Sequence, residues 1–287
     1  MTRGGGSERA GEPPPRVGAF VVREAIAAGS YGAVYRAEHA DGGAPAAIKI
    51  MHAELAASAE AVARFTLEVA VMQRARHPSV LAVLDSGRLA DGRLYLVTEL
   101  LIGESLEARL VRDGAIAAAE VLAILGPVCG ALATAHARGV VHRDVKASNV
   151  FLAGARPVLL DFGVAKLQGG GAALTATGDL IGTLSCMAPE QILGRAVDPR
   201  TDVYALGLLA FRMLTGGPVF AAKHPIALQQ MHLYTQPRAP GAVAGVDARF
   251  DEVVLRALAK APERRQSGAE GFFAELAACA GGLPSVG

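Results

Sequence analysis

The chain has 287 residues, of which 52% are hydrophobic and 19% charged, and its net charge is +1. This length suits one two-lobed domain or two small ones, with ample material for a core. The nearly balanced charge gives no reason to expect nucleic acid or an anionic membrane as a partner. The three cysteines are widely spaced and form no C-x-x-C pair, so neither a zinc site nor a disulfide framework is indicated.

No segment is expected to cross a membrane. The longest apolar stretches, such as residues 205–211, are far too short to span a bilayer. The N-terminus lacks the apolar core of a signal peptide. These features predict a cytoplasmic location, and they leave open both the oligomeric state and an anchor in a longer parent protein.

The pattern along the chain changes from strands to helices. Residues 1–15 are rich in Gly, Pro, Ser and charged residues, and we expect a disordered leader there. Alternating and β-branched runs predict strands over residues 17–26, 33–38, 46–51, 80–84 and 94–100. Helical spacing of apolar residues predicts helices over residues 59–76, 118–138, 203–214 and 250–258. A small strand-rich part therefore precedes a larger helical part, with the junction near residues 99–102.

A glycine turn between the first two predicted strands is a candidate phosphate-binding loop. Residues 26–34 read IAAGSYGAV, and their small side chains let backbone amides approach phosphate oxygens. The pattern G-x-G-x-x-G-x-V is met by Gly29, Gly32 and Val34, but Ala27 replaces the first glycine. Taken alone, such a loop is more often only a turn. Alanine restricts positive φ, so we expect altered loop flexibility rather than loss of nucleotide binding.

A lysine and a glutamate are candidates for positioning phosphates. Lys49 ends an apolar strand, a place where lysine is usually a solvated edge charge. Glu68 lies on the next predicted helix, and its neighbours Leu67 and Val69 argue against a fully solvated surface there. An ammonium held by that carboxylate would become a fixed point charge for the α- and β-phosphates.

Two short motifs carry most of the functional signal. Residues 142–149 read HRDVKASN, and residues 161–163 read DFG. H-R-D-x-x-x-x-N is a catalytic-loop pattern for phosphoryl transfer from ATP, and D-F-G is a metal-binding turn. An isolated aspartate in a loop is usually a turn former or a helix cap. That explanation fits the set poorly, because a base, oxygen ligands and a lysine occur together at one fixed spacing.

With these ordered motifs the chain resembles the eukaryotic-like (Hanks-type) Ser/Thr protein kinases, and particularly their bacterial members. The resemblance covers residues 17–280 and includes His77-Pro78, Ala188-Pro189-Glu190, Asp202 with the following Tyr-Ala-Leu-Gly, and Arg265. It implies an α+β, bilobal protein-kinase fold. The N-lobe (16–98) would hold a small antiparallel β-sheet and one main helix. A hinge (99–102), a mainly helical C-lobe (103–281) and a tail (282–287) would follow.

The resemblance implies a role for each matching residue. Asp144 would accept or orient the proton of the attacking hydroxyl, and Lys146 would offset the charge of the transferred group. Lys49 and Glu68 would complete the catalytic set. Asn149 and Asp161 would bind Mg²⁺, with Mn²⁺ as the alternative ion. The residues expected to bind ATP are Ile26, Ala27, Ala28, Gly29, Ser30, Tyr31, Gly32, Val34, Ala47, Lys49, Thr98, Glu99, Leu101, Ser105, Phe151 and Asp161.

The segment after the D-F-G motif bears on substrate and regulation. Lys146 and Thr183 together indicate Ser/Thr acceptors, and residues 182–190, GTLSCMAPE, match the substrate-docking segment of the family. Cys186 stands where a tyrosine is common. Thr175 and Thr177 lie in a Gly-rich polar stretch. We predict that phosphorylation of Thr177, Thr175 or both docks the loop on Arg143, which precedes the catalytic aspartate.

Glu190 is expected to pair with Arg265 in the buried base of the helical lobe. His142 is expected to have a packing role beneath Phe162 rather than a catalytic one. Both expectations concern the framework that holds the motifs rather than the chemistry itself.

The predicted function is transfer of the γ-phosphoryl group of Mg-ATP to protein Ser/Thr hydroxyls, regulated by autophosphorylation. A nucleotide-binding pseudokinase that acts as a scaffold is the alternative, and only Ala27 favours it. A small-molecule kinase of similar fold is opposed by the complete docking segment. A P-loop ATPase is excluded, because no G-x-x-x-x-G-K-[ST] occurs in the chain. The expected partners are protein substrates, not nucleic acid.

Overall fold

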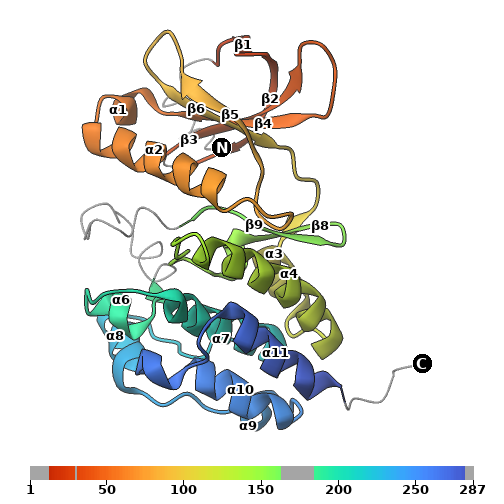
Figure 1. Ribbon diagram of the computed structural model, residues 1–287, viewed down its shortest axis with the longest axis vertical. Coiled ribbons are helices and arrows are strands. Elements are labelled where there is room, and N and C mark those ends of the chain that lie inside the picture. The colour runs from red at the N-terminus through yellow and green to blue at the C-terminus, as the bar shows by residue number, and fades with distance from the viewer. Residues whose placement is uncertain (1–12, 30, 163–183, 282–287) are drawn as a thin grey trace, which may run out of the picture. The chain divides into compact units, whose positions relative to one another are not determined.

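The computed structural model describes residues 13–29, 31–162 and 184–281. The described residues fall into two compact units, those within 13–73 and 81–102 and those within 74–80 and 103–281. Figure 1 follows the chain from the strands of the first unit to the helices of the second. The predicted leader and tail lie almost entirely outside the described residues, and their boundaries and that of the hinge stay predictions.

The first unit is built on one antiparallel sheet of six strands in the order β1-β2-β3-β4-β6-β5. Burial alternates along the central strands, as in a sheet with one face against a core. The core includes Tyr35, Ile48 and Val97. The elements are β1 (Arg16–Val17), β2 (Phe20–Ala28), β3 (Gly32–His39), β4 (Ala46–Met51), α1 (Ala53–Ala56), α2 (Ala59–Arg74), β5 (Val83–Arg88) and β6 (Leu94–Glu99).

One predicted strand of this region was misplaced. The strand expected over residues 80–84 is β5, which occupies Val83–Arg88. Val80 is 3% exposed and forms a parallel bridge with Leu159, so it belongs to the second unit. Residues 80 and 81 are both apolar and look like the start of one strand, but Val80 packs with the second unit and residue 81 with the first.

The second unit combines a three-stranded antiparallel sheet, in the order β7-β8-β9, with a helical core. The strands are β7 (Glu104–Ser105), β8 (Val150–Ala153) and β9 (Arg156–Leu159). The α-helices are α3 (Leu106–Asp113), α4 (Ala118–His136), α6 (Pro189–Ile192), α7 (Pro199–Thr215), α8 (Pro225–Tyr234), α9 (Pro240–Ala244), α10 (Arg249–Ala257) and α11 (Ala269–Ala280). Two 3₁₀ turns are η1 (Ala147–Asn149) and η3 (Pro262–Arg264).

Helix α7 is the centre of this unit. It starts four residues before the predicted helix, because Asp198 caps it by accepting from the Arg200 amide and Pro199 occupies the first turn. Gly216 ends it with a φ of 78°, in the left-handed region that glycine adopts easily. Nearly every residue from Thr201 to Leu214 is buried, so α7 contacts neighbours on all sides.

Helix α4 is long and apolar enough, by length and composition, to cross a membrane. In the structure its side chains Val121, Leu125, Val128 and Leu132 are buried in the helical core, where the helix packs against α7 and α11. Core helices of folded domains pass the same test of length and composition, so α4 is weak evidence for a membrane span.

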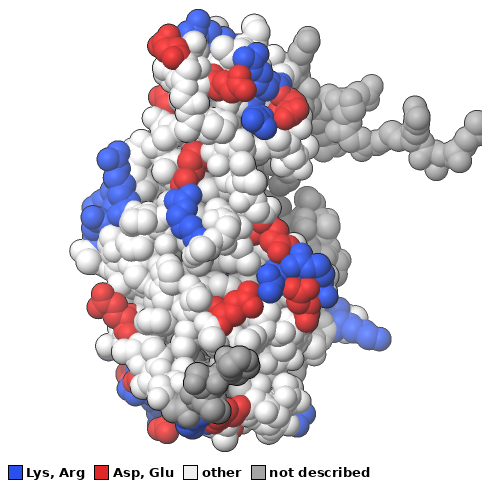
Figure 2. Space-filling model, turned by 90° about the vertical axis from the view of Figure 1, so that its right-hand side faces the viewer, with Lys and Arg blue, Asp and Glu red and all other residues white. Residues whose placement is uncertain are grey.

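Charged side chains are distributed in small groups of both signs over the face shown in Figure 2. Exposed ion pairs of the second unit include Arg112 with Glu104 and Arg256 with Glu275. Exposed pairs of this kind contribute little to stability.

His232, on α8, is buried in an aromatic environment. It is 1% exposed, and its Nδ1 lies 3.0 Å from the hydroxyl oxygen of Tyr204. Its ring also packs edge-on against Phe220, at a centroid distance of 5.1 Å. Burial and, to a smaller extent, the Lys260 ammonium together lower the pKa of His232 to about 4. The neutral imidazole is therefore the form that the fold accommodates.

Stability is expected to fall as the pH drops below 6.5. The folded-state pKa of His232 lies below the unfolded value, so the unfolded chain binds the proton first and protonation favours unfolding. The loss should reach about 2 kcal/mol near pH 5. Urea unfolding followed by circular dichroism at neutral pH and near pH 5 would measure it. His232→Asn, which keeps an acceptor for Tyr204, should flatten this dependence, whereas His224→Asn should not. An unchanged slope in His232→Asn would contradict the assignment.

Candidate active site

Asp144 lies in the loop before η1, and side chains hold both of its carboxylate oxygens. Oδ2 accepts hydrogen bonds from Lys146 Nζ at 2.9 Å and from Asn149 Nδ2 at 3.0 Å. Oδ1 accepts from the thiol of Cys186, at 3.3 Å from Sγ. The Asn149 amide nitrogen also donates to the backbone oxygen of Asp144, at 2.8 Å. The structure thus brings three predicted site residues together and fixes the orientation of one carboxylate.

Lys146 carries a positive charge beside this carboxylate. Burial works against that charge, but the charges of Asp144 and Asp161 and a hydrogen bond to Asp144 outweigh it and raise the pKa of Lys146 above its usual value. The ammonium therefore stays protonated at neutral pH and can offset negative charge that develops nearby.

Asp202, on α7, binds the backbone of the loop that contains Asp144. It is fully buried, and its Oδ2 accepts from the His142 amide at 2.8 Å and from His136 Nε2 at 2.7 Å. Its Oδ1 accepts from the Arg143 amide at 2.8 Å. Arg143 has a φ of 68°, which a side-chain-bearing residue rarely adopts. Such a conformation persists only where its surroundings enforce it, and here a buried carboxylate does so.

The predicted packing role of His142 is confirmed. Its ring lies against that of Phe162, with centroids 4.6 Å apart, and both side chains are buried. Its Nδ1 accepts from the Asp144 amide at 3.2 Å, so the imidazole also supports the loop. Asp161, the residue before Phe162, is exposed.

Asn149 and Asp161 offer oxygen ligands on neighbouring segments. The backbone oxygen of Asn149 accepts from the Leu160 amide at 2.8 Å, which ties η1 to the end of β9. Because the Asn149 nitrogen donates to Asp144, its side-chain oxygen is the atom that can bind a cation. One amide oxygen and one exposed carboxylate fit Mg²⁺, which prefers hard oxygen ligands and takes the rest from phosphates and water.

In the first unit, Lys49 of β4 forms an ion pair with Glu68 of α2. The distance from Nζ to Oε1 is 3.8 Å, and the two side chains are 29% and 22% exposed. This is longer than a hydrogen bond, so the pair is a charge contact. Lys49 sits in the middle of the sheet, paired with Val34 on β3 and Leu96 on β6.

The predicted phosphate loop is the β2–β3 hairpin. Gly29 donates its amide to the Gly32 oxygen at 2.9 Å. A Cβ on Gly32 would lie 2.1 Å from the Ile50 oxygen, so close backbone packing on β4 alone requires glycine there. Ala27 pairs with Val34 next to a register shift between Ala25 and Ala27, and its φ is not positive. This position therefore needs no glycine in the described conformation.

The remaining predicted nucleotide contacts are spread over both units. Ala47 pairs with Thr98 across β4 and β6, while Ser105 on β7 pairs with Phe151 on β8. Ser105 also caps α3 by accepting from the Ala108 amide at 3.1 Å, a structural reason for serine there. The other predicted contacts lie in the first unit, with Ile26, Ala28 and Tyr31 in or beside the hairpin and Glu99 and Leu101 at and after the end of β6. Outside the described residues lie Ser30, Gly163, Thr175, Thr177 and Thr183.

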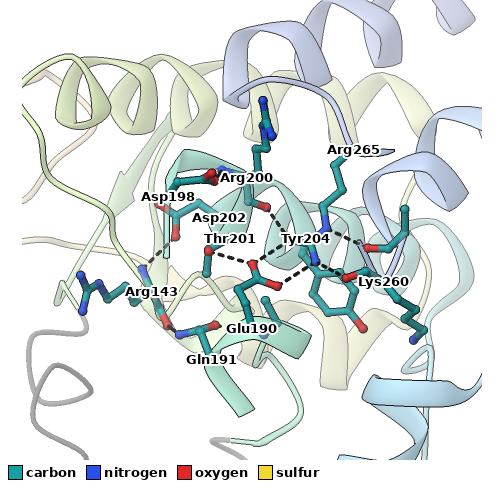
Figure 3. Close-up of polar contacts among 12 residues, drawn as sticks. Arg143, Glu190, Gln191, Asp198, Arg200, Thr201, Asp202, Tyr204, Lys260 and Arg265 are labelled. Carbon is teal, nitrogen blue, oxygen red and sulfur yellow. Dashed lines mark hydrogen bonds and ion pairs between the residues drawn. The ribbon is translucent and has the colours of Figure 1, made fainter. Parts of the chain in front are cut away.

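The predicted pair of Glu190 and Arg265 is confirmed (Figure 3). Two guanidinium nitrogens of Arg265 donate to the two carboxylate oxygens of Glu190, at 2.8 and 2.9 Å. The Glu190 side chain is 5% exposed and the Arg265 side chain 0%. Thr201 donates its hydroxyl to Glu190 at 2.8 Å. Arg265 also donates to three backbone oxygens, those of Ala259, Arg200 and Lys260.

Sequence reasoning missed how the segment around α6 holds the catalytic loop. Gln191 accepts from the Ala188 amide and donates to the Arg143 oxygen, both at 3.0 Å (Figure 3). The contact of Cys186 with Asp144 was also missed. The contacts with Arg143 and Asp144 join residues more than 40 positions apart, and no local pattern in the sequence indicates them.

Comparison with known proteins identifies the family. The family described as protein kinase domain matches residues 20–275. The chain belongs to the protein kinase family. Serine/threonine-protein kinase Pkn1 of Myxococcus xanthus is 40% identical over 263 residues, which is 90% of this chain and 38% of Pkn1. Serine/threonine-protein kinase PknL of Mycobacterium bovis is 36% identical over 264 residues, 91% of this chain and 65% of PknL. The chain thus spans less than two thirds of these relatives.

The fold of this chain also matches solved structures of kinase domains. The crystal structure of the Mycobacterium tuberculosis PknI kinase domain matches with a TM-score of 0.72 and 31% identity. The match covers 92% of this chain and 96% of that chain. The predicted family and the predicted α+β kinase fold are confirmed, and the names of the relatives support the predicted Ser/Thr class.

Proposed function

We propose that this kinase domain transfers the γ-phosphoryl group of Mg-ATP to Ser/Thr hydroxyls of protein substrates. The arrangement around Asp144 carries the proposal. A carboxylate that is oriented at both oxygens and flanked by a charged lysine suits the acceptance of a proton beside developing negative charge.

Each residue would have a separate task in the transfer. Asp144 orients the attacking hydroxyl and receives its proton, and Lys146 offsets charge on the phosphoryl oxygens. Asn149 and Asp161 would hold Mg²⁺, or Mn²⁺ as the alternative, which neutralises charge on the phosphates when bound. Lys49, kept in place by Glu68, would bind the α- and β-phosphates.

The proposal includes two further points that the sequence suggested. Phosphorylation of Thr175 and Thr177 would place negative charge near Arg143, whose backbone is fixed by Asp202. A cytoplasmic location is supported by three cysteines that are all free. The pseudokinase alternative rested on Ala27, and this residue pairs with Val34 at a φ that is not positive, which gives that alternative little support.

Incubation of the purified chain with Mg-ATP is expected to give phosphothreonine at residues 175 and 177, and phosphorylation of a generic basic substrate. Mass spectrometry of the product, with an EDTA-treated sample as control, checks both points. Transfer without modification of either threonine would contradict the proposed regulation alone. Failure both to transfer phosphate and to bind Mg-ATP in a calorimeter would overturn the proposed function.

A further inference from the structure

We propose that Cys186 is a positioning residue that sets the orientation of the Asp144 carboxylate for phosphoryl transfer. The thiol lies 3.3 Å from Asp144 Oδ1 and is 4% exposed. A thiol is a weak donor to neutral acceptors, but a hydrogen bond to an ionised carboxylate is stronger. This proposal rests on the proposed function, because it concerns the same carboxylate.

A carboxylate needs contacts at both oxygens to be fixed. The torsion that turns an aspartate carboxylate is broad and roughly two-fold, so the rotamer alone does not set its plane. Lys146 and Asn149 both bind Oδ2, so these two contacts act at the same end of the carboxylate. The Cys186 thiol holds Oδ1 and thereby sets the plane in which the base meets a hydroxyl.

The thiol can do this because its own segment is anchored. Four residues on, Glu190 forms its buried pair with Arg265, and Gln191 donates to the oxygen of Arg143, next to Asp144. Cys186 therefore belongs to a segment that is fixed to the helical core and also bonded to the catalytic loop. In the kinases that the chain resembles, tyrosine is common at this position, so the contact follows from a departure of this sequence.

A small cavity lies beside the thiol. It has a volume of about 70 Å³ and is lined by Lys146, Ser185, Cys186, Val219 and Phe220, among others. The Cys186 side chain thus borders a hollow, although it is itself buried.

Kinetics of three variants test the proposal. Cys186→Ala is expected to lower kcat about tenfold while the KM for ATP stays within about twofold, because the loss is one of orientation. Cys186→Ser keeps a short donor and should retain most of the activity. Cys279→Ala is the matched control, since that thiol donates to backbone oxygens on α11 and α10, and the kcat of this variant should equal that of the wild type. Wild-type kcat in Cys186→Ala, or an equal loss in Cys186→Ser, would overturn the proposal.

A second measurement does not depend on catalysis. The rate at which iodoacetamide labels Cys186, followed by mass spectrometry, is expected to rise about tenfold in Asp144→Asn, because loss of the neighbouring negative charge favours the reactive thiolate. Equal labelling rates would overturn the contact. A wild type that transfers no phosphate would overturn the proposed function and the positioning role with it. Wild-type transfer with an unaffected Cys186→Ala would overturn the positioning role alone.

Discussion

Replacement of Asp144 by Asn is expected to lower kcat roughly 10²–10⁴-fold, the range that a positioned general base contributes. The amide has nearly the same shape and can still accept from Lys146, so the loop should keep its structure. It cannot receive the proton of the attacking hydroxyl. Steady-state kinetics should therefore show a fall in kcat at an almost unchanged KM for ATP.

Comparison with other variants separates this role from nucleotide binding. Lys49→Met should raise the KM for ATP, because Lys49 would contact the phosphates. Asp161→Asn should raise the Mg²⁺ concentration needed for transfer, because Asp161 would contact the metal. Asp198→Asn is a matched control, since that aspartate is exposed and caps α7, a task that Asn performs equally well. Equal kcat in wild type and Asp144→Asn would remove Asp144 from the chemistry.

The contacts of Asp144 also show where sequence reasoning succeeds. Asp144, Lys146 and Asn149 lie within six consecutive residues, so their mutual contacts follow from local chain geometry and from one motif. The Lys49–Glu68 contact is less local, yet the strand and the helix that carry these residues are both strongly periodic. Motifs therefore indicated the side chains that the structure brings together within each unit.

The supporting contacts could not be predicted in the same way. Asp202 binds the loop backbone from 59 and 60 positions away, and Cys186 and Asp144 are 42 positions apart. The left-handed φ of Arg143 has no signal in the sequence either, because an arginine has no preference for it. Tertiary packing alone determines these features.

Secondary structure shows the same division. The strands β2, β3, β4 and β6 and helices α2, α4, α7 and α10 were predicted within a few residues, because one face of each alternates or the whole element is apolar. The helices α3, α8, α9 and α11 were not predicted. Helix α9 has five residues, and α8 carries exposed apolar side chains, Ile226 and Tyr234, that blur its helical pattern. The small sheet of β7, β8 and β9 consists of strands too short for a periodic signal.

Removal of the guanidinium of Arg265 is expected to destabilise the second unit by about 3–5 kcal/mol, as for other buried pairs that lose one partner. The Glu190 side chain is 5% exposed, and in Arg265→Met its buried negative charge would have no compensating guanidinium. Three backbone oxygens would also lose their hydrogen-bond donor. Because Glu190 and Gln191 are adjacent, the loss should also loosen the segment that holds the catalytic loop. Urea unfolding followed by circular dichroism measures the change.

The pH dependence of this loss identifies its cause. Burial raises the pKa of Glu190, but hydrogen bonds and charge from Arg265 outweigh it and keep the pKa below its usual value. In the wild type this stabilisation is present above the unfolded pKa and is lost as the pH falls through the folded one. In Arg265→Met, protonation of Glu190 would remove the buried charge. The difference in free energy of unfolding between this variant and the wild type should therefore narrow as the pH falls toward 4.5. Arg256→Met breaks the exposed pair with Glu275 and should change the midpoint little at any pH. A gap that stays constant with pH would show that lost packing, rather than a stranded carboxylate, destabilises Arg265→Met.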